Sequence, residues 1–150
     1  MFDKKEGVSL ESIWKLRMKL INEAKKIFDE SKAVTEESNR LHNDGIELHK
    51  KAYSDTKNIL VNDFRQQIKG EYIALKSNEI TYNANQESLK AEKLKLEANK
   101  LRILGEDIWI EAVYEVFGNI KIEFKDFNEK KHSHKCILYL KDATTKIFNP

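Results

Sequence analysis

Residues 70–101 read GEYIALKSNEITYNANQESLKAEKLKLEANKL, and this stretch decides the fold. A small side chain recurs at every seventh residue along it, and a large aliphatic side chain follows three residues after most of them. The small set is Gly70, Ser77, Ala84, Ala91 and Ala98, and the large set is Ile73, Ile80, Leu94 and Leu101. This 3–4 spacing places both sets on one face of an α-helix, where small side chains let a partner backbone approach closely. The stretch is therefore predicted to be a helix packed tightly against another helix.

An earlier stretch of the chain carries the same pattern. Its small residues are Ala24, Ser31, Ser38, Gly45 and Ala52, and its large residues are Leu20, Ile27, Val34, Leu41 and Leu48. Ser9 is the expected N-cap of this helix, and 63–66 (DFRQ) resembles a capping box for the next one. The polar segment 53–58 between them favours a reversal, which would make an antiparallel helical hairpin with a small-residue seam. The alternative is one continuous rod, because the step from Ala52 to Gly70 equals five full helical turns.

The second helix also has an apolar face that this seam does not use. Large apolar side chains recur by sevens roughly opposite the small residues. They are Ile68, Leu75, Tyr82, Leu89, Leu96 and Ile103, of which the first five are the expected oligomer interface. A helix that is apolar on two faces needs a second partner. Since the first helix already covers one face, we expect a second copy of the chain on the other, which predicts a homodimer.

The last third of the chain is expected to form a small end module. Gly105 is interpreted as the end of the long helix, followed by a short buried helix over 107–117 that stops at Gly118. Residues 120–124 alternate in period two and 135–140 are β-prone, which predicts a β-hairpin. Ile120, Ile122 and Phe124 would share one face, which is expected to pack on the helix over 107–117. The tail 144–150 has no clear structural signal. The predicted fold is mainly α, with a helical hairpin over 1–105 and a helix plus β-hairpin module over 106–150.

The composition excludes several classes of protein. Charged residues make up 35% of the 150 residues, but the net charge is only +2, so strong bulk attraction to nucleic acid or to an anionic membrane is not indicated. The single cysteine, Cys136, cannot form an internal disulfide and fits a reducing compartment. The sequence shows no bilayer-spanning apolar stretch and no secretory signal pattern. We therefore expect a cytoplasmic protein without membrane contact.

Signatures of catalysis and of metal binding are weak. The sequence has no Gly-rich phosphate loop, no Gly-x-Ser-x-Gly and no His-Glu-x-x-His, so neither an enzyme nor a cofactor is expected. His132, His134 and Cys136 alternate, and on a strand they would share one face, where zinc favours such ligands. If Phe124 paired with Cys136, Asp126 would face His134 as a fourth ligand. This spacing lacks the paired ligands of usual zinc sites, so a solvated turn with Cys136 in the core is favoured and no metal is predicted.

The end module is the expected site for a partner, because it combines aromatic and cationic side chains. The candidate partner-binding residues are Phe124, Lys125, Phe127, Lys130, Lys131, Lys135 and Tyr139. The favoured function is a non-enzymatic interaction protein that self-associates and binds another protein. Its richness in Lys, Asn and Ile suggests an accessory or host-inhibitory factor of a phage or mobile element. The alternatives are a nucleic-acid-binding module that uses the basic hairpin and a structural coiled coil.

Overall fold

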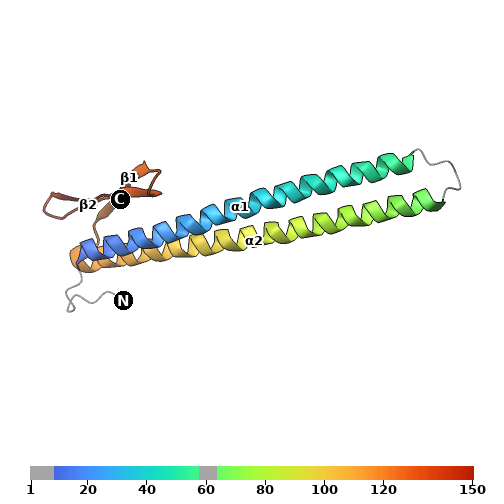
Figure 1. The fold of residues 1–150 in the computed structure, drawn as a ribbon. Helices are drawn as coiled ribbons and strands as arrows, with labels where there is room; N and C mark the ends of the chain where they lie inside the picture. The colour runs from blue at the N-terminus through green and yellow to red at the C-terminus, as the bar shows by residue number, and fades with distance from the viewer. Residues whose placement is uncertain (1–8, 58–63) are drawn as a thin grey trace. The chain divides into compact units, whose positions relative to one another are not determined.

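The computed structural model describes residues 9–57 and 64–150 and is mainly helical (Figure 1). Helix α1 spans Leu10–Lys57 and helix α2 spans Phe64–Phe117. Strands β1 (Lys121–Asn128), β2 (Ser133–Tyr139) and β3 (Thr145–Phe148) form one antiparallel sheet in the order β1-β2-β3. The expected capping box at 63–66 begins outside the described residues. The chain divides into two compact units, which we call the helical unit (residues 29–94) and the mixed unit (residues 1–28 and 95–150).

In the helical unit, α1 and α2 pack antiparallel through their small residues. The Ser77 hydroxyl donates a hydrogen bond to the Gly45 carbonyl at 2.6 Å, and the Ser38 hydroxyl donates one to the Ala84 carbonyl at 2.8 Å. Seven residues forward along α1 therefore correspond to seven residues back along α2. The antiparallel hairpin is confirmed and the continuous rod is wrong.

The small side chains are needed because the two backbones lie close together at this contact. Ser38 and Ala84 are fully buried, and Ser77 is almost so. A Cβ on Gly45 would lie 2.9 Å from Thr81 Oγ1 and 3.5 Å from the Ser77 carbonyl oxygen. A larger side chain at these positions would push the helices apart, as the repeating small residues indicate.

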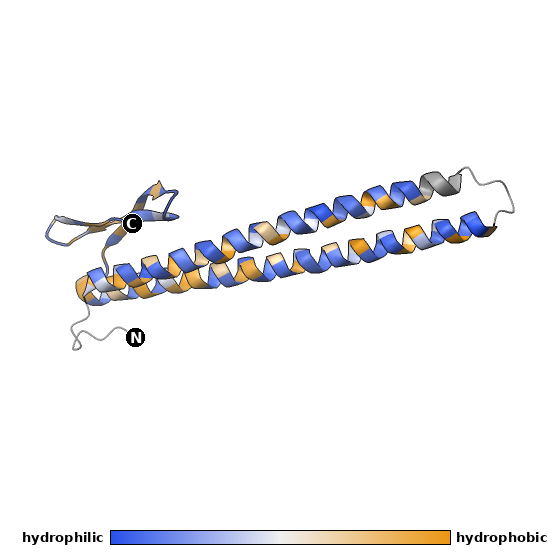
Figure 2. Ribbon diagram, in the orientation of Figure 1, coloured by the Kyte–Doolittle hydropathy of each residue, from blue (hydrophilic) through white to orange (hydrophobic). Residues whose placement is uncertain are grey.

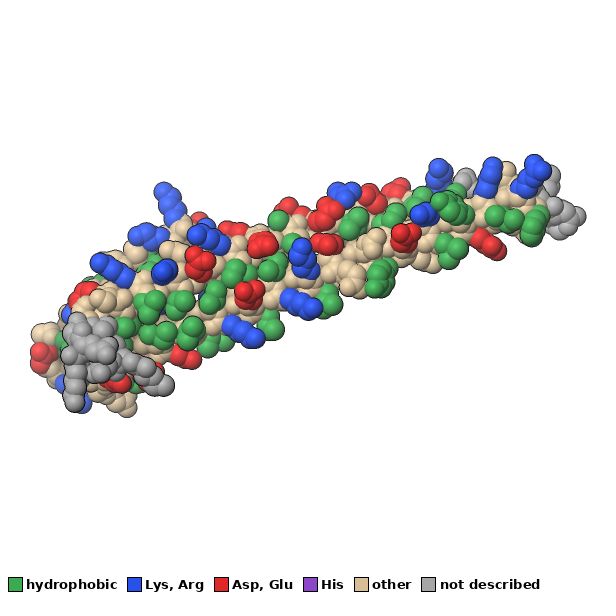
Figure 3. Space-filling model, turned by 60° about the horizontal axis from the view of Figure 1, so that its bottom comes forward, with side chains coloured by type: hydrophobic (Ala, Val, Ile, Leu, Met, Phe, Trp, Pro, Cys, Tyr) green, Lys and Arg blue, Asp and Glu red, His purple; other side chains and the backbone are tan. Residues whose placement is uncertain are grey.

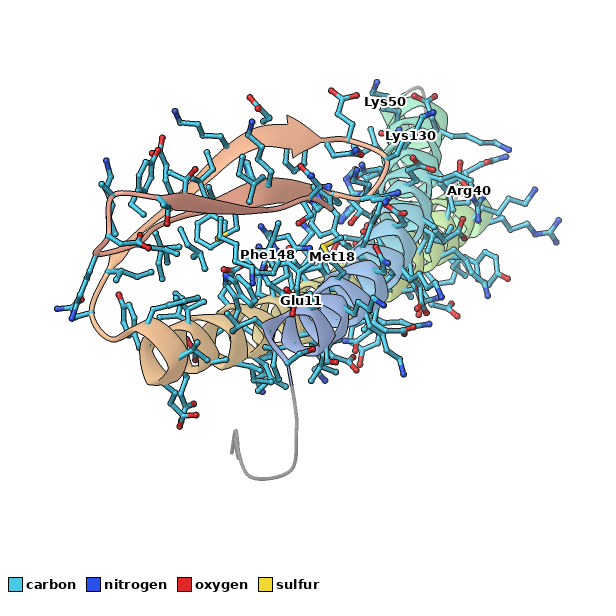
Figure 4. All side chains as sticks on the ribbon, turned by 90° about the vertical axis from the view of Figure 1, so that its left-hand side faces the viewer. Glu11, Met18, Arg40, Lys50, Lys130 and Phe148 are labelled. Atoms are coloured by element: carbon cyan, nitrogen blue, oxygen red, sulfur yellow. The ribbon has the colours of Figure 1, made fainter. Side chains whose placement is uncertain are left out.

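The mixed unit has an aromatic core beneath the sheet. Its buried residues are Leu10, Ile13, Trp14, Trp109, Ala112, Val113, Ile120, Cys136, Leu138 and Phe148. The Trp14 and Trp109 rings lie 4.8 Å apart, edge to face, and Phe148 lies at the same distance from Trp109. Figure 4 shows Met18 and Phe148 between the sheet and the helices. Ile122 and Phe124 also pack on this core, as the alternating pattern predicted.

Two expectations for this unit are wrong. Helix α2 continues through Gly105 to Phe117, so no separate helix begins at 107. Gly105 is buried because it continues the small-residue spacing, and a Cβ there would lie 3.6 Å from Arg17 Cγ. The tail, expected to be weakly specified, contains β3, which pairs with β2 and brings Phe148 into the core.

Two of the predicted helix ends are confirmed, the start at Ser9 and the end at Gly118. The Ser9 hydroxyl accepts a hydrogen bond from the Ser12 backbone N–H at 3.2 Å, which is an N-cap interaction. At the other end, Gly118 has a φ of +74° and donates its backbone N–H to the Tyr114 carbonyl. A left-handed glycine of this kind ends a helix at low cost, because it has no Cβ.

Candidate functional site

An exposed row of large apolar side chains lies on α2 of the helical unit. We call Ile68, Leu75, Tyr82 and Leu89 the apolar stripe; their exposed fractions are 50%, 67%, 63% and 52%. The buried Ser77 and Ala84 lie two residues after Leu75 and Tyr82, about 200° around the helix, so the stripe points away from α1. The ribbon in Figure 2 alternates between hydrophobic and hydrophilic residues along both helices, and Figure 3 shows hydrophobic side chains among charged ones. Leu96 and Ile103 continue the spacing in the mixed unit, with exposed fractions of 61% and 59%.

The predicted partner-binding residues do not form one surface. Phe124 faces the core, where the Arg17 guanidinium carbon lies 5.2 Å from its ring centroid. Lys125, Lys135 and Tyr139 lie on the opposite face of the sheet, because Phe124 pairs with Cys136 and Lys125 with Lys135. The alternation along β1 therefore places Phe124 on the core side of the sheet, where it is partly buried.

On the outer face of the sheet, the charged groups are largely paired with one another. Lys125 Nζ lies 2.8 Å from a Glu123 carboxylate oxygen, and the Tyr139 hydroxyl donates to the other oxygen at 2.7 Å. The Lys125 ammonium and then the Tyr139 hydroxyl lower the pKa of Glu123, and the Glu123 carboxylate raises the pKa of Tyr139. Lys135 pairs with Asp126 at 2.7 Å and lowers the pKa of that carboxyl. This pairing reduces the net positive charge that the face presents to nucleic acid.

The remaining predicted contacts lie around the β1–β2 turn. Phe127 is 47% exposed, and its ring centroid lies 5.2 Å from that of His132 and 4.9 Å from that of His134. Lys131 donates to the Pro150 carbonyl at 2.8 Å, while Lys130 is exposed. Phe127 and Lys130 are therefore the members of the predicted set that the turn leaves most accessible.

The residues considered for zinc are not brought together. Phe124 does pair with Cys136. However, Cys136 is buried on the core side and its Sγ accepts a hydrogen bond from Trp109 Nε1 at 3.3 Å. Burial raises the pKa of this thiol. Asp126 lies at an irregularity of β1 with a φ of 54° and pairs with Lys135. Within 9–57 and 64–150, no three His, Cys, Asp or Glu side chains are grouped to hold a metal ion.

Arg17 is a buried arginine that connects α1 to α2 and β2 of the mixed unit by hydrogen bonds. The sequence interpretation did not identify it. Arg17 is 2% exposed; its guanidinium donates to Glu106 Oε1 through Nε at 3.0 Å and also through Nη2. Nη1 donates to Ser133 Oγ at 3.2 Å, and the guanidinium carbon lies 4.5 Å from the Trp14 ring centroid. Arg17 lies seven residues before Ala24, so the small-residue spacing itself could have indicated its burial.

A groove with a basic rim runs beside α1 in the mixed unit. We call it the basic groove; its volume is about 580 Å³. Its lining residues are Trp14, Lys15, Met18, Lys19, Asn22, Glu23, Lys26, Lys131, Asn149 and Pro150. Four lysines against one glutamate make this groove positively charged.

The end of α2 in the same unit carries the opposite charge. Asp107, Glu111 and Glu115 recur at every fourth residue, with Ile110 and the 44% exposed Tyr114 between them. These five side chains form a row along α2 and border a shallow, open depression of about 470 Å³; we call the row the acidic ridge. The side chains of all three acids are exposed.

Comparisons with models of protein families, with curated proteins and with solved structures find no match. A search of the described helices finds none with the length and apolar character needed to cross a membrane.

Proposed function

We propose that this protein is a non-enzymatic interaction protein that forms a homodimer through the apolar stripe of α2 and binds a further protein. The exposure of the stripe is the observation that carries the proposal. Four large apolar side chains, spaced by seven residues along one face of α2, are at least half exposed. The opposite face of the same helix is buried against α1. Monomeric proteins rarely leave such a contiguous row open to water.

The geometry of the stripe favours a second helix as its cover. A large side chain every seven residues matches the repeat with which one helix packs along another. Burying one such side chain fully contributes about 1.5–3 kcal/mol, and a two-fold dimer would use the stripe of each copy. Asn78 and Asn85 flank the stripe with exposed, uncharged side chains, which adds no charge repulsion near its centre.

Sedimentation equilibrium tests the homodimer. We expect dimers at micromolar concentration, and a dissociation constant at least about tenfold higher for Leu89→Lys, because the new ammonium would be desolvated at the contact. Asn39→Lys, which adds the same charge at an exposed position of α1, is the matched control and should leave the dimer unchanged. A wild-type monomer at high concentration would contradict the homodimer.

The second part of the proposal concerns the partner protein, for which Phe127 and Lys130 of the turn are the accessible candidates. Deleting the sheet would be a poor test, because it would uncover Trp14 and Trp109. We instead expect Phe127→Ala combined with Lys130→Ala to reduce recovery of the partner in cross-linked pull-downs. Lys121→Ala on the outer face is the control. Equal recovery of the partner by the wild type, the double variant and the control would show that the partner binds at another surface.

A further inference from the structure

The basic groove combines exposed lysines with an apolar base. Lys15, Lys19 and Lys26 line it from α1, and Lys131 lines it from the β1–β2 turn. Lys26 lies 3.5 Å from Glu23, and Lys131 donates to the Pro150 carbonyl. Lys15 and Lys19 pair with no acidic side chain of the described residues. The groove thus has two exposed ammonium groups available to a binding partner.

The base of the groove is apolar, which narrows the kind of ligand that fits. Trp14 is 6% exposed and Met18 is half-buried, and both lie among the lysines. A free inorganic anion would use the lysines but not this base. A protein surface that combines carboxylates with apolar side chains would use both.

The acidic ridge of the same chain has this combination. Asp107, Glu111 and Glu115 are four residues apart, as are Lys15 and Lys19, and this spacing corresponds to about 6 Å along each helix. Ile110 and Tyr114 lie between the acids and supply apolar surface of the kind that the base of the groove would pack against. None of the three acids pairs with a basic side chain in the part of the chain that the structure describes.

We propose that the acidic ridge of one copy docks into the basic groove of a second copy. This inference rests on the proposed self-association and adds a second contact, whose chemistry differs from that of the apolar stripe. Three carboxylates meet a rim of four lysines and one glutamate, so the charges are complementary. The contact joins copies either head to tail or as a reciprocal two-fold pair. Because it links chains other than the two that share the apolar stripe, it builds species larger than two chains in both cases.

Sedimentation velocity of the full chain at low and high salt tests this contact. In ~0.1 M salt we expect species larger than the dimer; they should disappear in ~1 M salt, where the Debye length falls from about 10 Å to about 3 Å. Lys15→Glu combined with Lys19→Glu, or Glu111→Lys combined with Glu115→Lys, should raise the concentration needed for the larger species at least about tenfold. All the substituted side chains are exposed, so helical content should not change.

Mixing the two double variants is the most specific test. In the mixture, the groove and the ridge of one variant can each contact a surface of opposite charge on the other variant. The larger species should return in the mixture and in the single chain that carries all four substitutions. Lys50→Glu combined with Lys51→Glu is the control for net charge and should behave like wild type. Larger species that survive either double variant, or fail to return in the mixture, would overturn the contact.

Two further results separate this inference from the proposed function. The first result is a dimer that survives both charge-reversed double variants but is lost in Leu89→Lys. It would assign the dimer to the apolar stripe and the larger species to the groove. If wild type forms no salt-sensitive species but Lys15→Glu with Lys19→Glu loses retention on heparin, the groove binds another polyanion, and the second copy is excluded as its occupant.

Discussion

The helical unit and the mixed unit are built from the same two helices, yet they are stabilised differently. In the helical unit, small side chains bring the backbones together and hydroxyls such as Ser38 and Ser77 donate to carbonyls of the opposite helix. In the mixed unit the sheet adds a third layer, with Trp14, Trp109 and Phe148 between them. The same seven-residue spacing of small side chains is therefore compatible with a two-helix contact and with a contact covered by a sheet. The outer face of α2 is exposed in both units, at Leu75 and Leu89 in the helical unit and at Leu96 and Ile103 in the mixed unit.

The largest expected effect lies in the aromatic core of the mixed unit. Trp109 is fully buried, contacts the rings of Trp14 and Phe148, and donates to Cys136. Trp109→Ala should lower the free energy of unfolding by about 3–5 kcal/mol, because it removes a large buried side chain and leaves a cavity. Urea denaturation measures this loss. Leu104→Ala, at a 48% exposed position, is the control and should cost less than about 1 kcal/mol.

The ion pair of Arg17 should give the next largest effect. Glu106→Gln removes the carboxylate from a guanidinium that is 2% exposed, and should cost about 2–3 kcal/mol. This value is below that of a fully buried pair because the Glu106 side chain is 36% exposed. Arg17→Met combined with Glu106→Leu should cost less than Glu106→Gln alone, since no charge is then left unpaired. A double variant less stable than Glu106→Gln would contradict this account.

Larger side chains at the small-residue contact of the helical unit should lower the free energy of unfolding somewhat less than loss of the Arg17 ion pair does. Ala84→Leu and Gly45→Leu add side chains where the opposite backbone is close, at a cost of roughly 1–3 kcal/mol each. Lys32→Leu adds the same side chain at an exposed position of α1 and should be nearly neutral. Thermal unfolding by circular dichroism compares the three. Similar losses at all three sites would show that the small residues do not define the contact.

The small-residue contact could be predicted from the sequence because the signal for it is local and periodic. The predictions failed where tertiary packing overrides the local preference of a residue. Gly105 was interpreted as a helix end from the usual behaviour of glycine, but its place in the register reflects contact with Arg17. Strand β3 carries no distinct local signal, since it forms by pairing with β2. Phe124 was assigned both to the core face and to a binding surface, and the structure places it on the core face.

The basic groove and the acidic ridge could be predicted only in part. The four-residue spacing of Asp107, Glu111 and Glu115 is visible in the sequence, as is that of Lys15 and Lys19. What the sequence does not show is that Lys131 lines the groove together with α1, because that contact depends on how the sheet packs on the helices.

The smallest expected effect compares two buried glycines, Gly45 of the helical unit and Gly105 of the mixed unit. In an open helical position Gly→Ala stabilises by roughly 0.5–1 kcal/mol, because alanine restricts the unfolded chain. A Cβ at Gly105 would meet Arg17 and Leu20 at 3.6 Å, an ordinary contact distance, so Gly105→Ala should gain stability. A Cβ at Gly45 would meet Thr81 Oγ1 at 2.9 Å, so Gly45→Ala should lose stability unless Thr81→Ala is added. Urea unfolding should therefore rank Gly105→Ala above Gly45→Ala, and the reverse order would mean that the helices approach more closely in the mixed unit.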